Sequence, residues 1–227
     1  MKKHFLLFSL LTLFFTAIQL TAQIKVGAQV GVVDASQKIS LDGSLGILGG
    51  DTDSRIGFNL GVFAEIGENN VRFQPELLFS SKGSFRPNDS LGLADRDHVI
   101  NYLEIPLQGK YYFLDNDKLS AYGLAGIYIG LSLSGKVVEE GVATDYKMTF
   151  DDTDLLGYSS KIDYGVPLGA GLNFAIGDGY LFGEVRYHFG MKKVQESNAV
   201  DTGGGTGIGF NSKNRTTALN VGYMMSF

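Results

Sequence analysis

Cysteine and tryptophan are absent from this chain of 227 residues, and proline occurs only four times. The lack of cysteine excludes disulfide scaffolds, thiolate metal sites, cysteine nucleophiles and a lipid-modified N-terminal cysteine. Positive charge is not in excess either: the formal net charge is −5, so the electrostatics do not favour a nucleic-acid partner. With 44% hydrophobic and 19% charged residues, the chain is also too apolar to be intrinsically disordered.

Glycine and aromatic residues are abundant instead. There are 31 glycines, 16 phenylalanines and 11 tyrosines. Glycine destabilises helices, whereas closed β-architectures commonly combine it with aromatic residues. The composition therefore favours an all-β protein.

The N-terminus has the pattern of a targeting segment. Two lysines in Met1–His4 precede an apolar run from Phe5 to Ile18. This run is shorter than the roughly 20 residues that a transmembrane helix needs, and it fits the charged and apolar regions of a secretory signal peptide. We expect residues 1–22 to be the signal peptide and residues 23–227 to form the mature domain. An uncleaved membrane anchor is the alternative.

Apolar residues alternate with polar or small ones along much of the mature chain, which is the period-two pattern of β-strands. Arg55–Ile66 is a clear case: Leu60 and the apolar residues two and four positions away share one face, while Asn59 and Glu65 lie on the other. Eight strands are predicted in this way, at residues 23–33, 55–66, 71–82, 98–113, 119–134, 160–176, 180–190 and 215–227.

Short and long gaps between these strands alternate along the chain. The short gaps are Gly67–Asn70, Leu114–Lys118 and Gly177–Gly179; the long gaps are residues 34–54, 83–97, 135–159 and 191–214. Outer-membrane barrels combine short periplasmic turns with long extracellular loops. The sequence therefore predicts an eight-stranded antiparallel up-and-down transmembrane β-barrel with four long extracellular loops, three short periplasmic turns and both termini in the periplasm.

The faces opposite the apolar rows indicate which side of the barrel is outside. They carry many glycines and long polar side chains: Lys25, Gln29, Arg72, Gln74, Glu76, Glu104, Gln108, Lys110, Glu184, Arg186, His188 and Asn220. Such a mixture suits the crowded lumen of an eight-stranded barrel in lipid, and aromatic residues near both ends of the apolar face fit interfacial girdles. We expect Leu60, Leu168 and Val221 to face lipid. A soluble barrel with its apolar face inside is the alternative.

Pro75, Pro106 and Pro167 fall inside predicted strands. Proline cannot donate a hydrogen bond to a β-ladder, and a closed barrel has no free edge to accommodate it. We expect each of the three to lie at a bulge or at a strand end.

Two neighbouring motifs resemble a known family. Arg72–Gly83 (RFQPELLFSSKG) and Asn101–Phe113 (NYLEIPLQGKYYF) are similar to the PorT-like outer-membrane β-barrel family of Bacteroidota, a porin-type family, and Gly165–Phe174, Gly183–Gly190 and Val221–Phe227 resemble its later strands. The resemblance implies an eight-stranded barrel in the outer membrane of a Gram-negative cell. The activity of that family is mostly unassigned. A founding member is tied to protein secretion, but a shared fold does not transfer that role.

Two groups of residues are candidate functional sites. Tyr223, Met225 and Phe227 resemble the C-terminal signal read by the barrel assembly machinery, although a lipid-facing strand that merely ends in phenylalanine would look the same. A lumenal network of paired charges is expected because unpaired buried ions are costly, with Glu76 meeting Lys110 across one hairpin; an ion- or proton-conducting path is the alternative. The predicted network comprises Arg72, Glu76, Glu104, Lys110, Glu184 and Arg186.

Catalytic, metal and cofactor sites are not predicted. Glu184, Arg186 and His188 share one face, but no motif ties a serine or aspartate to His188, so a hydrogen-bonded lumenal histidine is expected. The acidic segment Lys136–Asp154 lacks the ligand spacing of a dedicated Ca²⁺ loop. The glycine-rich segment Asp201–Gly209 lacks the strand-to-helix context of a nucleotide site.

Three functions remain open at this point. The first is a non-enzymatic barrel with a structural, binding or export-accessory role exercised through its loops. The second is a narrow channel or a component of protein secretion, and the third is a barrel enzyme with His188 as its base. The expected partners are outer-membrane lipid, the barrel assembly machinery and a protein bound by the loops.

Overall fold

The computed structural model describes residues 23–42, 50–51, 53–86, 96–139, 142–144, 160–197 and 209–226. Eight long strands run through these residues: β1 (Ile24–Asp42), β3 (Arg55–Ile66), β4 (Val71–Arg86), β5 (Arg96–Asp115), β6 (Leu119–Glu139), β8 (Ile162–Ile176), β9 (Gly179–Gly190) and β11 (Gly209–Ser226). Three short strands pair with the ends of long ones: β2 (Gly50–Asp51), β7 (Val142–Thr144) and β10 (Gln195–Ser197). No helix among the described residues has the length and apolar character needed to cross a bilayer.

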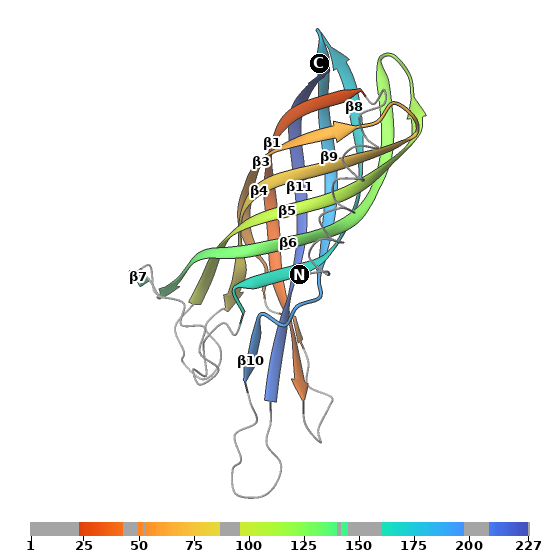
Figure 1. Ribbon diagram of the computed structural model, residues 1–227. Helices are drawn as coiled ribbons and strands as arrows, with labels where there is room; N and C mark the ends of the chain where they lie inside the picture. The colour runs from red at the N-terminus through yellow and green to blue at the C-terminus, as the bar shows by residue number, and fades with distance from the viewer. Residues whose placement is uncertain are drawn as a thin grey trace, which may run out of the picture.

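The eight long strands form a closed antiparallel barrel (Figure 1). Each strand pairs with the long strands before and after it in the chain, and β11 pairs with β1 to complete the cylinder. Closure gives both sides of every long strand a partner, which a sheet in lipid requires because unpaired backbone groups there are costly. The predicted eight-stranded up-and-down barrel is confirmed.

Short and long connections lie at opposite ends of the barrel. The short turns join β3 to β4, β5 to β6 and β8 to β9, and the two glycines that begin the first and third of these turns have positive φ angles of 129° (Gly67) and 60° (Gly177). Lys25 pairs with Ser226 at this same end, so both ends of the described barrel lie beside the short turns. The opposite ends of the eight long strands lie together at the other end of the barrel, which we call the loop end (Figure 1).

Apolar side chains face outward and polar side chains face the lumen. Leu60, Leu168 and Val221 are 57%, 44% and 50% exposed, whereas Asn59 and Asn220 are buried. Exposed aromatic residues lie near both ends of this outward face: Tyr111, Phe113, Phe174 and Tyr223 toward the short turns, and Phe58, Tyr164 and Phe189 toward the loop end. A soluble barrel would need the opposite arrangement, so that alternative is wrong.

Five strands extend farther toward the loop end than the alternation predicted, whereas β3 and β9 reach it at the predicted residues 55 and 190, and β8 begins at Ile162 where residue 160 was predicted. β1 was expected to end at residue 33 and β11 to begin at residue 215, but their ladder continues to the pair Asp42–Gly209. Similarly, β5 begins at Arg96 and β6 ends at Glu139. These extensions form two ribbons that project beyond the barrel (Figure 1). They are rich in polar residues, so apolar periodicity did not reveal them.

The three prolines lie inside strands, and the expectation of bulges or strand ends is wrong. The β6–β8 ladder is interrupted between the pairs Ala125–Leu168 and Tyr128–Gly165, beside Pro167, and the register is the same on both sides. Equivalent interruptions occur in the β3–β4 ladder beside Pro75 and in the β4–β5 ladder beside Pro106. The barrel therefore accommodates each missing donor by opening one ladder locally instead of shifting register.

Candidate functional site

The lumen contains a balanced set of buried charges. Among the described residues, five cationic and five anionic side chains are buried: Lys25, Arg72, Lys82, Lys110 and Arg186, with Glu65, Glu76, Glu104, Asp163 and Glu184. Strand alternation directs these side chains inward, and an eight-stranded barrel is narrow enough for them to meet. All six residues proposed from the sequence belong to this set.

The middle of the lumen is crossed by an ion pair between opposite walls. Arg186 of β9 donates to both carboxylate oxygens of Glu76 of β4, at 2.8 Å from Nη1 and 3.0 Å from Nη2. The Nε atom of Arg186 also donates to Glu184 at 2.7 Å, and the Tyr122 hydroxyl donates to the same carboxylate at 2.9 Å. Because β4 and β9 are four strands apart in a ring of eight, this contact spans the barrel.

Toward the short turns, Glu65 is the centre of a second cluster. Its carboxylate accepts hydrogen bonds from the Tyr112 hydroxyl at 2.7 Å, from Arg72 at 3.1 Å and from Lys110 at 3.3 Å. Arg72 also pairs with Asp115 and stacks on the Tyr112 ring, 3.9 Å from its centroid. This cluster joins β3, β4 and β5 in one network.

Toward the loop end, Lys82 pairs with Glu104 at 2.5 Å. Asp163 accepts hydrogen bonds from Asn214 at 2.9 Å and from the Tyr128 hydroxyl at 3.2 Å. These contacts connect β4 with β5, and β8 with β6 and β11. The three clusters follow one another along the barrel axis, so the lumen is filled by ion pairs and hydrogen bonds.

The pairing differs from the one expected. Glu76 was predicted to meet Lys110, but Glu76 binds Arg186 and Lys110 binds Glu65. Sequence reasoning also left Glu65, Lys82 and Asp163 out of the network. Each of them occupies a lumen-facing position of its strand, so the alternation alone could have identified them.

His188 is buried and packs on Tyr128, with ring centroids 5.1 Å apart. It lies on the same face of β9 as Glu184 and Arg186, but those two residues form the central cluster with Glu76. No group of three or more histidine, aspartate or glutamate side chains in the described part of the chain is arranged to hold a metal ion.

Apolar clusters accompany the charges near both ends of the lumen. Phe63, Phe182 and Met224 pack together beside the short turns. At the loop end, Val194 follows β9, its backbone nitrogen donates to Ser212 at 2.9 Å, and its side chain is fully buried against Ile100 and Tyr102. The lumen is thus narrowed by apolar side chains at each end.

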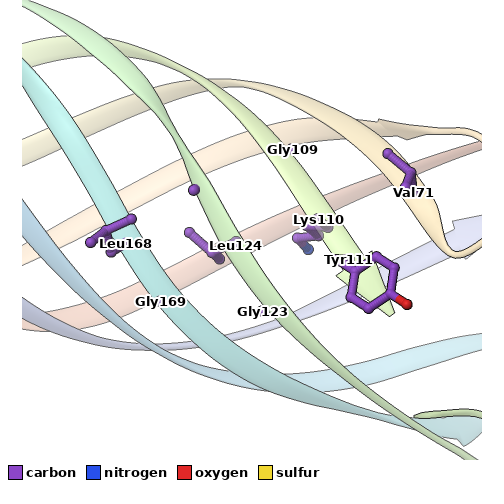
Figure 2. A pocket seen from close by; sticks show the side chains of 9 residues that line it. Val71, Gly109, Lys110, Tyr111, Gly123, Leu124, Leu168 and Gly169 are labelled. Atoms are coloured by element: carbon purple, nitrogen blue, oxygen red, sulfur yellow. The ribbon is translucent and has the colours of Figure 1, made fainter. Parts of the chain in front are cut away.

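A shallow depression of about 520 Å³ lies on the outer wall (Figure 2). Gly109, Gly123 and Ala125 leave this part of β5 and β6 without large side chains. The exposed residues Val71, Tyr111 and Leu168 stand around it, so it belongs to the lipid-facing surface.

The structure describes the other predicted sites only in part. Tyr223 and Met225 face outward on β11 and are exposed, whereas Phe227 lies outside the described residues. The signal peptide 1–22 lies outside them as well. Most of the acidic segment Lys136–Asp154 and of the glycine-rich segment Asp201–Gly209 also falls outside, although Lys136 belongs to β6 and Gly209 begins β11.

Comparisons with known proteins agree with this architecture. A family model described as "Outer membrane protein beta-barrel domain" matches residues 18–196, and no curated protein matches the chain. One similar solved structure is Neisserial surface protein A, with 16% identity, coverage of 92% of this chain and 100% of that chain, and a TM-score of 0.45. Another is Ail, the attachment invasion locus protein of Yersinia pestis, with 17% identity, coverage of 88% and 98%, and a TM-score of 0.41. A third is the outer membrane protease OmpT from Escherichia coli, with 9% identity, coverage of 92% and 99%, and a TM-score of 0.39.

Proposed function

Since the chain belongs to the family of outer membrane protein beta-barrel domains, we propose that this outer-membrane barrel neither conducts ions nor catalyses a reaction, and that it binds a partner through its loop end. In this proposal the loop end faces the cell exterior and both termini face the periplasm. The bound partner is a protein of the cell surface or of an export complex.

The observation that carries the proposal is the extension of the β1–β11 ladder. The outward apolar residues of β1 end at Val32, yet pairing continues from Val33–Ala218 to Asp42–Gly209. At about 3.3 Å per residue, this ribbon extends on the order of 30 Å along the strands beyond the last outward apolar residue of β1. Such a ribbon carries the ends of β1 and β11 away from the outward apolar residues of β1 and offers a paired backbone surface to a partner.

The filled lumen supports the non-conducting part of the proposal. The Arg186–Glu76 pair spans the barrel, and apolar clusters narrow it on either side. A water-filled pore of the kind found in large porins needs many more strands. Planar-bilayer recordings of the purified protein are expected to show no channels, and stable unitary conductance would overturn this part.

The buried position of His188 supports the absence of catalysis. Its side chain is 3% exposed and stacks on Tyr128, so a substrate at the loop end does not reach it. The similar OmpT structure is a protease, which makes proteolysis the activity to test. Peptide and lipid hydrolysis by the wild type that disappears in His188→Ala would show that the chain is an enzyme.

The role of the loops is tested by shortening them. In one variant residues 43–49 are replaced by a short Gly-Ser linker, and in another residues 198–208 are replaced. Chemical crosslinking on intact cells is expected to join a partner to the wild type and to lose it in at least one variant. Equal crosslinking in both variants, with correct insertion, would contradict a binding role for these segments.

A PorT-like, export-accessory role is the more specific form of this proposal. The two motifs that resemble the PorT-like family of Bacteroidota lie on neighbouring strands, with Pro75 opposite Leu107 and Leu78 opposite Glu104 in the register of β4 and β5. Deletion of the gene is then expected to reduce the amount of secreted protein. Unchanged secretion would leave binding at the loop end as the function.

A further inference from the structure

Two cations stand on the outward face of β11, beyond its apolar residues. Ser212, Asn214 and Thr216 are buried in the lumen, so the alternating residues Lys213 and Arg215 face outward. Leu219 and Val221 continue the same face toward the short turns and are exposed to lipid. Arg215 and Lys213 therefore lie about 13 and 20 Å along the strand from Leu219, at 3.3 Å per residue.

The register partners of these two residues carry no negative charge. Lys213 stands directly opposite Lys38 of β1, and like charges at opposing positions of an antiparallel pair repel each other. Arg215 stands opposite Ser36 of β1 and Phe189 of β9. No carboxylate pairs with Lys213 or Arg215 in the part of the chain that the structure describes. A negatively charged ligand between Lys38 and Lys213 would relieve their repulsion.

Three acidic residues lie in the same region. Asp34 faces outward on β1, opposite Thr217, and is exposed. Asp51 of β2 stands opposite Lys38 on the side away from β11. Glu196 of β10 stands opposite Asn211, two residues from Lys213. None of the three is a register partner of Lys213 or Arg215, and β11 itself carries no acidic residue between Gly209 and Ser226.

Arg215 is held in place by backbone contacts. Its Nη1 atom donates to the carbonyl oxygens of Gly190 at 2.7 Å and Asn214 at 3.0 Å, and its guanidinium lies 5.8 Å from the centroid of the Phe189 ring. Both hydrogen bonds use the same nitrogen, and a guanidinium has five donors in all. The remaining donors suit an oxyanion such as phosphate, for which arginine provides matching planar geometry.

The position of the cations along the barrel identifies the kind of molecule that would supply this oxyanion. Phe189 and Tyr164 are exposed aromatic residues near the loop end of the outward surface, with the exposed apolar residues Met191 and Ile162 two positions farther on, and aromatic residues at such a level meet lipid headgroups. Arg215 is the register partner of Phe189.

We propose that Lys213, Arg215 and Lys38 form a binding site for the phosphorylated headgroup of a glycolipid in the leaflet at the loop end. The headgroup phosphates lie between the cations, and the acyl chains run along the outward apolar residues of β1, β9 and β11. Lys38 lies on β1 and Lys213 and Arg215 lie on β11, two residues apart. Such a spread of positive charge suits a headgroup with more than one phosphate. This site rests on the proposed function only in taking the loop end as the outer side.

The test is native mass spectrometry of the whole barrel in neutral detergent, titrated with bisphosphorylated lipid A. Each juxtamembrane cation contributes on the order of 1 kcal/mol to binding an anionic lipid surface, so the Lys213→Gln/Arg215→Gln double variant is expected to lower the apparent affinity about tenfold or more. Lys38→Gln/Lys213→Gln is a second variant that leaves the Arg215 contacts intact. Dephosphorylated lipid A is expected to bind the wild type as weakly as bisphosphorylated lipid A binds the double variant.

Lys136→Gln is the matched control, because Lys136 is an exposed lysine at the loop end of β6 and stands opposite Val99. Its affinity for lipid A is expected to equal that of the wild type. The proposal would be overturned if the wild type and both double variants bound bisphosphorylated lipid A equally well. It would also be overturned if the wild type bound dephosphorylated and bisphosphorylated lipid A equally well, or if Lys136→Gln lost as much affinity as the double variants. Protease accessibility of the loops on intact cells tests the orientation separately, since lipid binding in detergent does not depend on it.

Discussion

Arg186 on β9 and Glu76 on β4 meet across the whole width of the barrel, through two hydrogen bonds of 2.8 and 3.0 Å. Their strands are not neighbours, so the contact forms only after the sheet has closed. The same arginine holds Glu184. One cation therefore compensates two buried carboxylates that stand on opposite walls.

Removing Arg186 is expected to destabilise the barrel much more than neutralising Glu76. Arg186→Met leaves Glu76 and Glu184 without their cation, and breaking a buried ion pair in this way costs about 3–5 kcal/mol. Glu76→Gln leaves the Arg186–Glu184 pair intact, so its effect is smaller. Urea unfolding in lipid vesicles measures both values, and equal midpoints for the two variants would contradict the role assigned to Arg186.

Gly171 provides the space that the Tyr122 hydroxyl occupies. A Cβ atom at Gly171 would lie 2.4 Å from that oxygen, which donates to Glu184. Gly171→Ala is therefore expected to cost about 1–3 kcal/mol through overpacking. Gly183→Ala on β9 is the control, because its Cβ would have no atom within 4 Å; thermal unfolding should separate the two variants, and identical behaviour would refute the close packing.

Charge on the outward face should be costly in proportion to its depth in the membrane. Leu60 lies midway along β3, whereas Ile56 lies near its loop end, and both are exposed. Leu60→Arg is expected to cost about 2–4 kcal/mol and Ile56→Arg about 0–1 kcal/mol in lipid. Unfolding from vesicles provides the measurement. If Leu60→Arg had no effect, water and not lipid would surround the barrel.

The last residue is expected to matter for insertion more than for the finished fold. In the sequence Tyr223, Met225 and Phe227 stand at every second position, and we propose that the barrel assembly machinery reads them. Deleting Phe227 should lower the yield of membrane-inserted protein in cells while leaving spontaneous refolding in detergent intact. Deleting an equivalent residue from the N-terminal end of the mature chain serves as the control, and unchanged insertion without Phe227 would argue against the signal.

Alternation predicted the barrel and the direction of its side chains. Leu60 and Val221 are exposed, and Arg72, Glu104 and Lys110 are buried, because a strand with one apolar face has only one way to orient in lipid. The partners of the buried charges could not be predicted in the same way. Whether Glu76 faces Lys110 or Arg186 depends on the stagger of the strands around the cylinder, which local sequence does not determine.

The loop ends of β1, β6 and β11 were predicted poorly for a related reason, although the bounds of β3 were predicted correctly. Beyond Val33 the residues of β1 include Asp34, Gln37 and Lys38, so no apolar row continues. Pairing with β11 maintains the strand there, and that is a property of two distant segments together. The prolines show the converse: Pro106 suggests a break, yet the ladders around it hold the strand in register.

The seam between β1 and β11 sets an order for biogenesis. Two segments nearly 170 or more residues apart in the sequence supply this ladder, from Lys25–Ser226 to Asp42–Gly209. Until β11 has been synthesised, β1 has an open hydrogen-bonding edge. A chain that stops before residue 209 cannot close the barrel. A helper protein that protects that edge until the last strand docks would prevent unfinished chains from aggregating.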